Sequence, residues 1–169
     1  MTAGLEVEGV QPGSPLWDPF VAVFCAVFPR EAETAPGFLR RYAGLPDYLG
    51  LLGRVDGNAV GMAMGVKVER GNWWVERVAQ QLGADHHALQ DAFCVVELGV
   101  LEAFRGRGIG GVLLHELLGA QEHPRAVLST EVSNVAAQRF YERHGWTVIH
   151  PGFVFTPGQE PFCVMAFGG

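Results

Sequence analysis

A glycine-rich stretch near the middle of the chain constrains the fold more than any other feature. It reads AFRGRGIGG at residues 103–111 and leads directly into VLLHELL at residues 112–118. Glycine lets the backbone turn tightly and approach another group closely, and arginine attracts anions. The nearly continuous apolar run before it, residues 93–100, is typical of a buried central strand. A strand, a glycine turn and a helix are therefore predicted, and the free N–H groups at such a helix start suit a pyrophosphate.

The composition limits what else the chain can be. With 169 residues, 49% of them apolar and 18% charged, it is expected to form one globular domain over residues 1–169. The formal net charge of −6 argues against nucleic acid as a partner, because nucleic-acid-binding proteins usually need a broad basic face. An anionic ligand must therefore be held by a local arrangement of backbone N–H groups and arginines.

The rest of the chain is predicted to form strands and helices in turn. Strands are expected at residues 5–10, 48–55, 59–68, 93–100, 126–130, 146–154 and 161–167, and helices at 16–29, 36–42, 73–82, after 109 and from 134 to 145. Asp56 and Gly57 are expected to form the turn of a hairpin. This order predicts an α/β or α+β fold with a single mixed, mostly antiparallel central sheet of about six to seven strands flanked by helices.

Several kinds of site and location are disfavoured. Cys25, Cys94 and Cys163 lie in apolar runs without metal-ligand spacing, so core positions are expected for them. The histidines form no zinc motif, and no metal site is expected. The first residues lack a secretory signal pattern, and no apolar run reaches the roughly 18 residues of a membrane span. We therefore expect a cytoplasmic protein without a membrane partner.

The residues of the loop leave two specific interpretations open, besides a plain tight turn. Gly106, Gly108 and Gly111 satisfy the G-x-G-x-x-G pattern of dinucleotide-binding folds, and Glu131 lies 20 residues further on, where a ribose-binding acid is expected. Only 38 residues follow Glu131, however, which is too few for the remaining parallel strands of that fold. The second interpretation uses Arg105-x-x-Gly108-x-Gly110 as the working frame.

That second frame resembles a known family. The segment VLEAFRGRGIG at residues 100–110 is similar to motif A of the GNAT N-acetyltransferase superfamily, V-x-x-x-x-(Q/R)-x-x-G-x-(G/A). The segments LSTEVSN at residues 128–134 and VAAQRFYERHGW at residues 135–146 are similar to motif B of the same family. Together the two motifs cover roughly residues 93–154, in the right order. The resemblance implies a GNAT-like fold, with acetyl-coenzyme A as cosubstrate and its pyrophosphate on the loop.

The resemblance also implies which residues form the site. Tyr141 matches the catalytic tyrosine, which protonates the departing thiolate, and the backbone N–H of Val100 matches the donor to the oxyanion. Gly99 fits a local bulge of the opened central strand. The residues expected to contact the cofactor are Leu98, Gly99, Val100, Arg105, Gly106, Arg107, Gly108, Ile109, Gly110, Gly111, Asn134 and Tyr141. Asn134 equally suits a plain helix cap, whereas packing in the core is the lesser alternative for Tyr141.

The general base is less constrained. Glu97 leads because it is the only ionisable residue within residues 93–100, although strand alternation could turn it to the opposite face from Leu98 and Val100. Glu131 is the alternate. His86 and His87 are further candidates.

The acceptor is expected to be a small-molecule primary amine that reacts directly in a ternary complex, bound by the aromatic segments 20–42 and 151–161. A protein N-terminus as acceptor, a non-catalytic sensor that binds coenzyme A, and an NAD-binding domain remain as alternatives. Trp73 and Trp74 either line the same cleft or cover the sheet. A monomer or a homodimer fits the chain.

Overall fold

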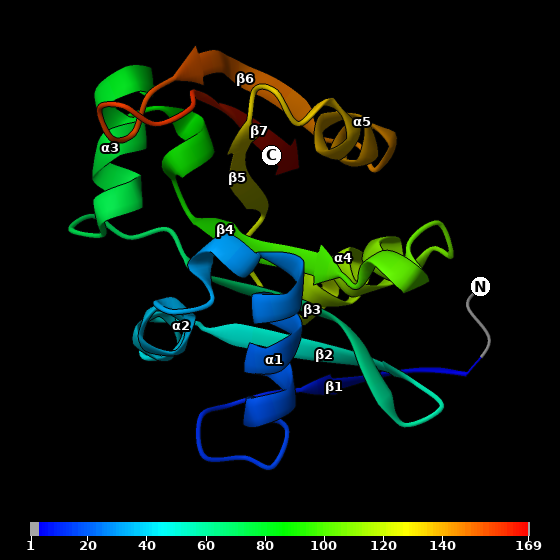
Figure 1. Cartoon of the computed structure of the whole chain (residues 1–169). Helices are drawn as coiled ribbons and strands as arrows, with labels where there is room; N and C mark the ends of the chain where they lie inside the picture. The colour runs from blue at the N-terminus through cyan, green and yellow to red at the C-terminus, as the bar shows by residue number, and fades with distance from the viewer. Residues whose placement is uncertain (1–3, 169) are drawn as a thin grey trace. The chain divides into compact units, whose positions relative to one another are not determined.

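The computed structural model describes residues 4–168 (Figure 1). Seven strands within this range form one sheet in the order β1-β2-β3-β4-β5-β7-β6. The strands are β1 (Leu5–Gly9), β2 (Leu49–Val55), β3 (Asn58–Lys67), β4 (Ala92–Val100), β5 (Arg125–Glu131), β6 (Thr147–Phe153) and β7 (Phe162–Gly168). β4 pairs with β5 in parallel, whereas β1–β2, β2–β3, β5–β7 and β6–β7 are antiparallel. The predicted mixed, mostly antiparallel sheet is confirmed.

The helices lie close to their predicted positions. They are α1 (Trp17–Val27), α2 (Ala35–Ala43), α3 (Trp73–Leu82), α4 (Ile109–Ala120) and α5 (Val135–Arg143), with short 3-10 turns η1 (Pro29–Glu31), η2 (His87–Leu89) and η3 (Glu102–Phe104). α1 ends two residues before the predicted end at Pro29. Phe28 leaves the helical region, with φ −121° and ψ 69°, because the proline ring crowds the backbone of the residue before it.

The hairpin between β2 and β3 turns where the sequence predicts it. Asp56 has φ 50° and Gly57 has φ 80°, so both central residues adopt the left-handed conformation. A two-residue turn of this kind matches the right-handed twist of the strands that it joins. Val55 pairs with Asn58 on either side of the turn, which confirms the predicted hairpin.

The described chain divides into two compact units. Unit 1 contains the described residues up to Val66 together with Val95–Glu122, and unit 2 contains Lys67–Cys94 together with the described residues from His123 onward. Each unit is described by itself below. The prediction of a single domain over residues 1–169 stays a prediction.

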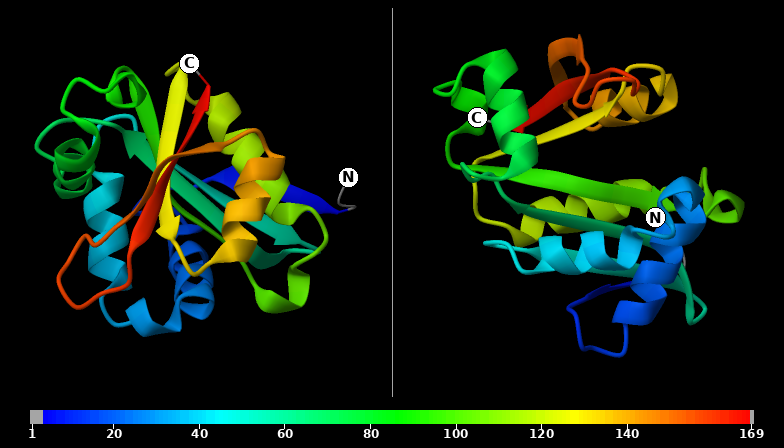
Figure 2. Two further views of the ribbon diagram at one scale, coloured as in Figure 1. Left: turned by 90° about the horizontal axis from the view of Figure 1, so that it is seen from above. Right: turned by 60° about the vertical axis from the view of Figure 1, so that its left-hand side comes forward.

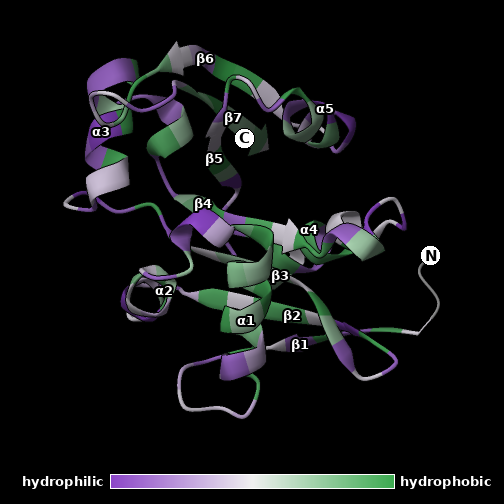
Figure 3. Ribbon diagram, viewed as in Figure 1, coloured by the Kyte–Doolittle hydropathy of each residue, from purple (hydrophilic) through white to green (hydrophobic). Residues whose placement is uncertain are grey.

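In unit 1, helices cover both faces of the β1–β3 strands (Figure 1). On one face, α1 and α2 pack on Leu52, Met62 and Met64 in a core in which Phe20 and Phe24 are fully buried. Figure 3 shows α1 as a largely hydrophobic helix, as this burial requires. On the other face, α4 contacts β2, and Leu113 reaches the backbone of Gly53 and Gly61. Small residues at these two paired positions let α4 approach the sheet closely.

In unit 2, β7 lies between β5 and β6, and Figure 2 shows β5 and β7 side by side. Trp74 on α3 donates a hydrogen bond from its indole Nε1 to Ser129 Oγ on β5, at 2.8 Å. Trp146 is buried between the rings of Tyr141 and Phe167. Trp74 is thus tied to the sheet, whereas 55% of Trp73 is exposed.

β4 contains one residue more than the stretch of β3 that it pairs with. At one end Val68 N–H donates to Ala92 O, and at the other Leu101 N–H donates to Val60 O, both at 2.8 Å. Eight steps along β3 therefore oppose nine steps along β4, which defines a bulge.

The bulge lies between Val96 and Gly99. Val96 packs against the α1–α2 core, and a Cβ built on Gly99 would lie 2.8 Å from Val27 Cγ1 of α1. Both positions therefore face the same helices, although three steps along a regular strand would place them on opposite faces. The extra residue turns position 99 to the same face as Val96.

The close contact at Gly99 gives a stability prediction. We expect Gly99→Ala to lower the free energy of unfolding by about 1–3 kcal/mol, because the new methyl group overlaps a β-branched helical side chain that has little rotamer freedom. Gly119→Ala on α4 is the matched control, since a Cβ there meets nothing within 4 Å and should raise stability by about 0.4–1 kcal/mol. Urea unfolding of both variants measures this, and equal stability of the two would contradict the close packing.

Candidate functional site

The corner between β4 and α4 presents free backbone N–H groups. Gly106 and Gly108 both adopt the left-handed conformation, with φ 77° and 81°. α4 begins at Ile109, and no side chain caps its N-terminus. By contrast, Asn72 caps α3 and Asn134 caps α5 through their side-chain oxygens. The N–H groups in the first turn of α4 therefore remain available to an anion, at the positive end of the helix dipole.

The two arginines of the corner have different surroundings. Arg105 donates from Nε to the carbonyl oxygen of Val100 at 3.0 Å, so its side chain ties the loop to the end of β4. The guanidinium carbon of Arg107 lies 4.9 Å from the ring centroid of Phe104, which supports it by a cation–π contact. Both side chains are exposed. Their positive charges therefore add to the positive potential at the start of α4.

The end of β4 directs a backbone donor away from β3. Leu101 N–H donates to Val60 O of β3, and successive N–H groups of a strand point to opposite edges. The N–H of Val100 therefore points to the other edge of β4. Gly99 is buried and Leu98 is partly exposed at the same end of the strand. All of these residues belong to unit 1, together with Glu97 and the loop of residues 105–111.

Glu97 has a strongly perturbed carboxyl group. Desolvation by burial is the main cause and the negative charge of Glu31 is the second, and together they raise the pKa of Glu97 from 4.5 to about 8. A carboxyl that titrates near neutral pH is suited to taking up and releasing protons.

The two remaining predicted residues belong to unit 2. Asn134 accepts a hydrogen bond from Ala137 N at 3.1 Å, so it serves as the cap of α5. Gln138 donates from Nε2 to the carbonyl oxygens of Glu131, Val132 and Asn134 and holds the turn between β5 and α5. Tyr141 is buried, with its ring 5.2 Å from that of Phe140.

The alternate base candidates also belong to unit 2. Glu131 is exposed at the end of β5, with Ser133 Oγ at 3.5 Å from its carboxylate. His86 caps the short η2 turn, because its Nδ1 accepts from Ala88 N–H at 3.1 Å. His87 stacks on His86 with ring centroids 4.7 Å apart.

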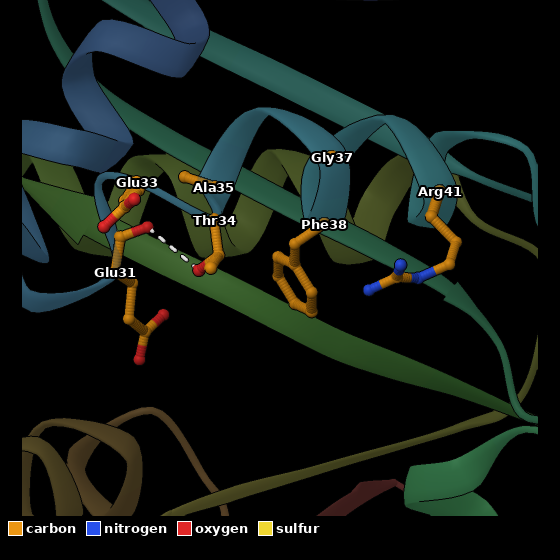
Figure 4. A pocket seen from close by; sticks show the side chains of 7 residues that line it. All are labelled: Glu31, Glu33, Thr34, Ala35, Gly37, Phe38 and Arg41. Carbon is orange, nitrogen blue, oxygen red and sulfur yellow. Dashed lines mark hydrogen bonds between the residues drawn. The ribbon is translucent and has the colours of Figure 1, made fainter.

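A pocket in unit 1 contains charged residues that the sequence analysis did not single out. It measures about 510 Å³ and lies along α2 (Figure 4). Its lining residues are Glu31, Glu33, Thr34, Ala35, Gly37, Phe38 and Arg41. The aromatic and apolar character of residues 20–42 is thus interrupted by acidic residues before α2 and by arginines in its last turn.

The described part of the chain lacks two further kinds of feature, a cluster of metal-ligating side chains and a membrane-spanning helix. No group of three or more His, Cys, Asp or Glu residues within residues 4–168 could hold a metal ion. None of the helices in that range combines the length and the apolar character needed to cross a membrane.

The fold has many solved relatives. An aminoglycoside 6'-acetyltransferase type Ii is 16% identical with a TM-score of 0.70, and the match covers 96% of each chain. A GNAT family acetyltransferase from Elizabethkingia anophelis, solved with acetyl-CoA bound, is 13% identical with a TM-score of 0.63, and the match covers 99% of each chain. At these identities the likeness shows a shared fold.

Sequence comparison identifies the family. A GCN5-like protein acetyltransferase of Mycobacterium tuberculosis is 30% identical over 116 residues, which are 63% of this chain and 56% of the relative. The match thus spans little more than half the length of that protein. The model of the acetyltransferase (GNAT) family matches residues 16–146, which is most of the chain. The resemblance seen in motifs A and B is confirmed, and the chain belongs to the acetyltransferase (GNAT) family.

Proposed function

We propose that the protein is an N-acetyltransferase that moves the acetyl group of acetyl-coenzyme A directly to a primary amine of a small molecule in a ternary complex. The observation that carries the proposal is the corner after β4, where an uncapped helix start, two left-handed glycines and two exposed arginines come together. The chain as a whole has a net charge of −6, so the positive potential at this corner is a local feature. Family membership supports the same reaction.

The residues of unit 1 fit the cofactor chemically. A pyrophosphate needs several N–H donors that approach closely, and the first turn of α4 supplies them without a competing side-chain cap. Gly106 offers open space beside the loop, since a Cβ there would meet nothing within 4 Å. We propose that Ile109, Gly110 and Gly111 hold the pyrophosphate and that Leu98, Gly99 and Val100 hold the pantetheine amides. In unit 2, we propose Asn134 and Tyr141 as further cofactor contacts.

Each proposed catalytic residue has a separate task. Bound acetyl-coenzyme A supplies an acetyl thioester, so that an amide C–N bond forms as the C–S bond breaks. The carboxylate of Glu97 takes the proton that the attacking amine must lose, because an alkyl amine with a pKa near 10 is mostly protonated at neutral pH. The N–H of Val100 donates a hydrogen bond to the carbonyl oxygen on which negative charge develops. The hydroxyl of Tyr141 provides a proton to the leaving sulfur and regains one when the acetylated nitrogen loses its second proton.

Charge reversal at the corner tests cofactor binding. We expect Arg107→Glu to weaken the binding of acetyl-coenzyme A at least about tenfold, because it places a negative charge beside the phosphates. Arg77→Glu on α3 is the matched control, since Arg77 also stacks on an aromatic ring, that of Trp73 at 5.6 Å. Thermal shifts with acetyl-coenzyme A, coenzyme A and NAD measure the effect. Stabilisation by NAD alone would contradict the proposal and favour a dinucleotide site.

Removal of one hydroxyl group tests the acid. Tyr141→Phe keeps the ring that packs between Phe140 and Trp146 and should therefore preserve the fold. We expect kcat to fall by about 10²–10⁴ with KM little changed, since a positioned general acid contributes that much. Release of free thiol is followed over a panel of small amines and one short peptide with a free N-terminus. Unchanged kcat in the variant would exclude the acid role, and cofactor binding without thiol release for any amine would favour a sensor.

The pH dependence tests the base. Glu97 acts as a base only when ionised, and its pKa is raised to about 8, so kcat/KM should rise with pH up to about 8 and then level off. Glu31→Gln should move this rise to lower pH, because it removes the second cause of the raised pKa. Glu97→Gln should abolish the rise and most of the activity. A profile of Glu97→Gln with the same rise as the unmodified protein would assign the base to Glu131 or to a histidine.

A further inference from the structure

The α2 pocket carries opposite charges at its two ends. Figure 4 shows Glu31 and Glu33 at one end and Arg41 at the other, with the ring of Phe38 between them. The guanidinium group of Arg41 extends toward that ring. A pocket of about 510 Å³ with this lining is large enough for a small organic molecule. A ligand that satisfies it must be cationic at one end and anionic at the other.

None of these three charged side chains has a polar partner among the described residues. Among the described residues, the carboxylates of Glu31 and Glu33 and the guanidinium of Arg41 have no hydrogen bond or ion pair. At the pocket, Thr34 donates from Oγ1 to the backbone oxygen of Glu31 and not to its carboxylate. Their charges are therefore available to a ligand, and the planar fork of arginine is well matched to a carboxylate.

The ring of Phe38 separates the acidic end of the pocket from Arg41. Figure 4 shows that ring between them, so a ligand that reaches both ends must extend past it. The ammonium and carboxylate of an α-amino acid are too close together to reach both ends. A chain of several bonds between the two groups is needed.

The acidic end lies toward the proposed base. Glu31 acts electrostatically on Glu97 of β4, and both residues belong to unit 1. An ammonium group beside Glu31 is thus placed on the side of the pocket where the proton must be removed. The carboxylate end, at Arg41, then fixes the length and direction of the acceptor.

From this arrangement we infer that the acceptor is an amine that also carries a carboxylate several bonds away, with its ammonium bound by Glu31 and Glu33 and its carboxylate by Arg41. The inference rests on the proposed N-acetyl transfer and specifies its substrate class. The aromatic face of Phe38 lies along the apolar linker between the two charged groups.

Helix electrostatics offers a competing explanation for the same charges. Acidic residues before a helix and basic residues in its last turn stabilise the helix dipole without any ligand. Arg40 and Arg41 both lie in the last turn of α2, but Arg40 stacks over Trp17 at 5.6 Å and does not line the pocket. Both arginines can stabilise the helix dipole, but only Arg41 lines the pocket and can contact a ligand there. Arg40 is therefore a matched control for Arg41.

Three amines of equal chain length test the inference. The acceptors are 6-aminohexanoate, hexylamine and 1,6-diaminohexane, which differ only in the group at the far end. We expect kcat/KM for 6-aminohexanoate to exceed that for hexylamine by about fivefold to tenfold, as a charge-assisted contact in a partly exposed pocket allows. Arg41→Gln should bring the ratio to about 1, and Arg41→Glu should shift the preference to 1,6-diaminohexane. Arg40→Gln should leave the ratio unchanged.

The outcomes separate this inference from the proposed function. Equal kcat/KM for the three amines, or an equal effect of Arg40→Gln and Arg41→Gln, would overturn it while leaving N-acetyl transfer intact. Calorimetric titration of the protein with the same amines, in the absence of cofactor, measures how the Arg41 substitutions change amine affinity, independently of turnover. No thiol release with any amine would refute the proposed function. Loss of 6-aminohexanoate binding in Arg41→Gln but not in Arg40→Gln would then still support the pocket.

Discussion

The extra residue in β4 is the constraint on which the arrangement of unit 1 depends. β3 holds the strand by a hydrogen bond at each end, so the added length cannot slide out and must be taken up between Val96 and Gly99. Residue 99 is thereby turned against Val27, where only glycine fits without displacing α1. At the end of the strand Leu101 donates to Val60, which directs the N–H of Val100 away from β3. The inserted residue thus fixes the contact between Gly99 and α1 one position before this backbone donor.

The glycine corner follows from the end of that strand. An uncapped helix start usually costs about 0.5–2 kcal/mol relative to one with a good cap, and α3 and α5 avoid this cost with asparagines. α4 is held instead by its packing, since Ile109, Leu113 and Leu117 are buried and Leu113 contacts the small residues of β2 and β3. Apolar contacts thus stabilise α4 and leave its N-terminus free for an anion.

The features that sequence predicted are those that local chemistry determines. The Asp56-Gly57 turn, the cap at Asn134 and the strand–glycine–helix order each depend on neighbouring residues. The motif spacing that identified the family is of the same kind.

The missed features join residues distant in the chain. Glu31 and Glu97 are 66 positions apart, so no pattern in the sequence could show that one raises the pKa of the other. Likewise, Arg41 at the end of a short helix is read first as a helix-stabilising charge, and only the pocket shows that it differs from Arg40.

The carboxyls of unit 1 also explain how a cationic acceptor and a base of raised pKa can work together. At neutral pH the amine is protonated and Glu97, with a pKa of about 8, is largely protonated too, so neither is ready to react. An ammonium bound beside Glu31 offsets the negative charge that contributes to the raised pKa, which favours loss of the Glu97 proton. Burial is the larger cause and is not removed by the acceptor, so the pKa stays above that of an ordinary glutamate. In the proposed mechanism, binding of a cationic amine therefore favours the ionised form of the proposed base, and an uncharged acceptor analogue does not.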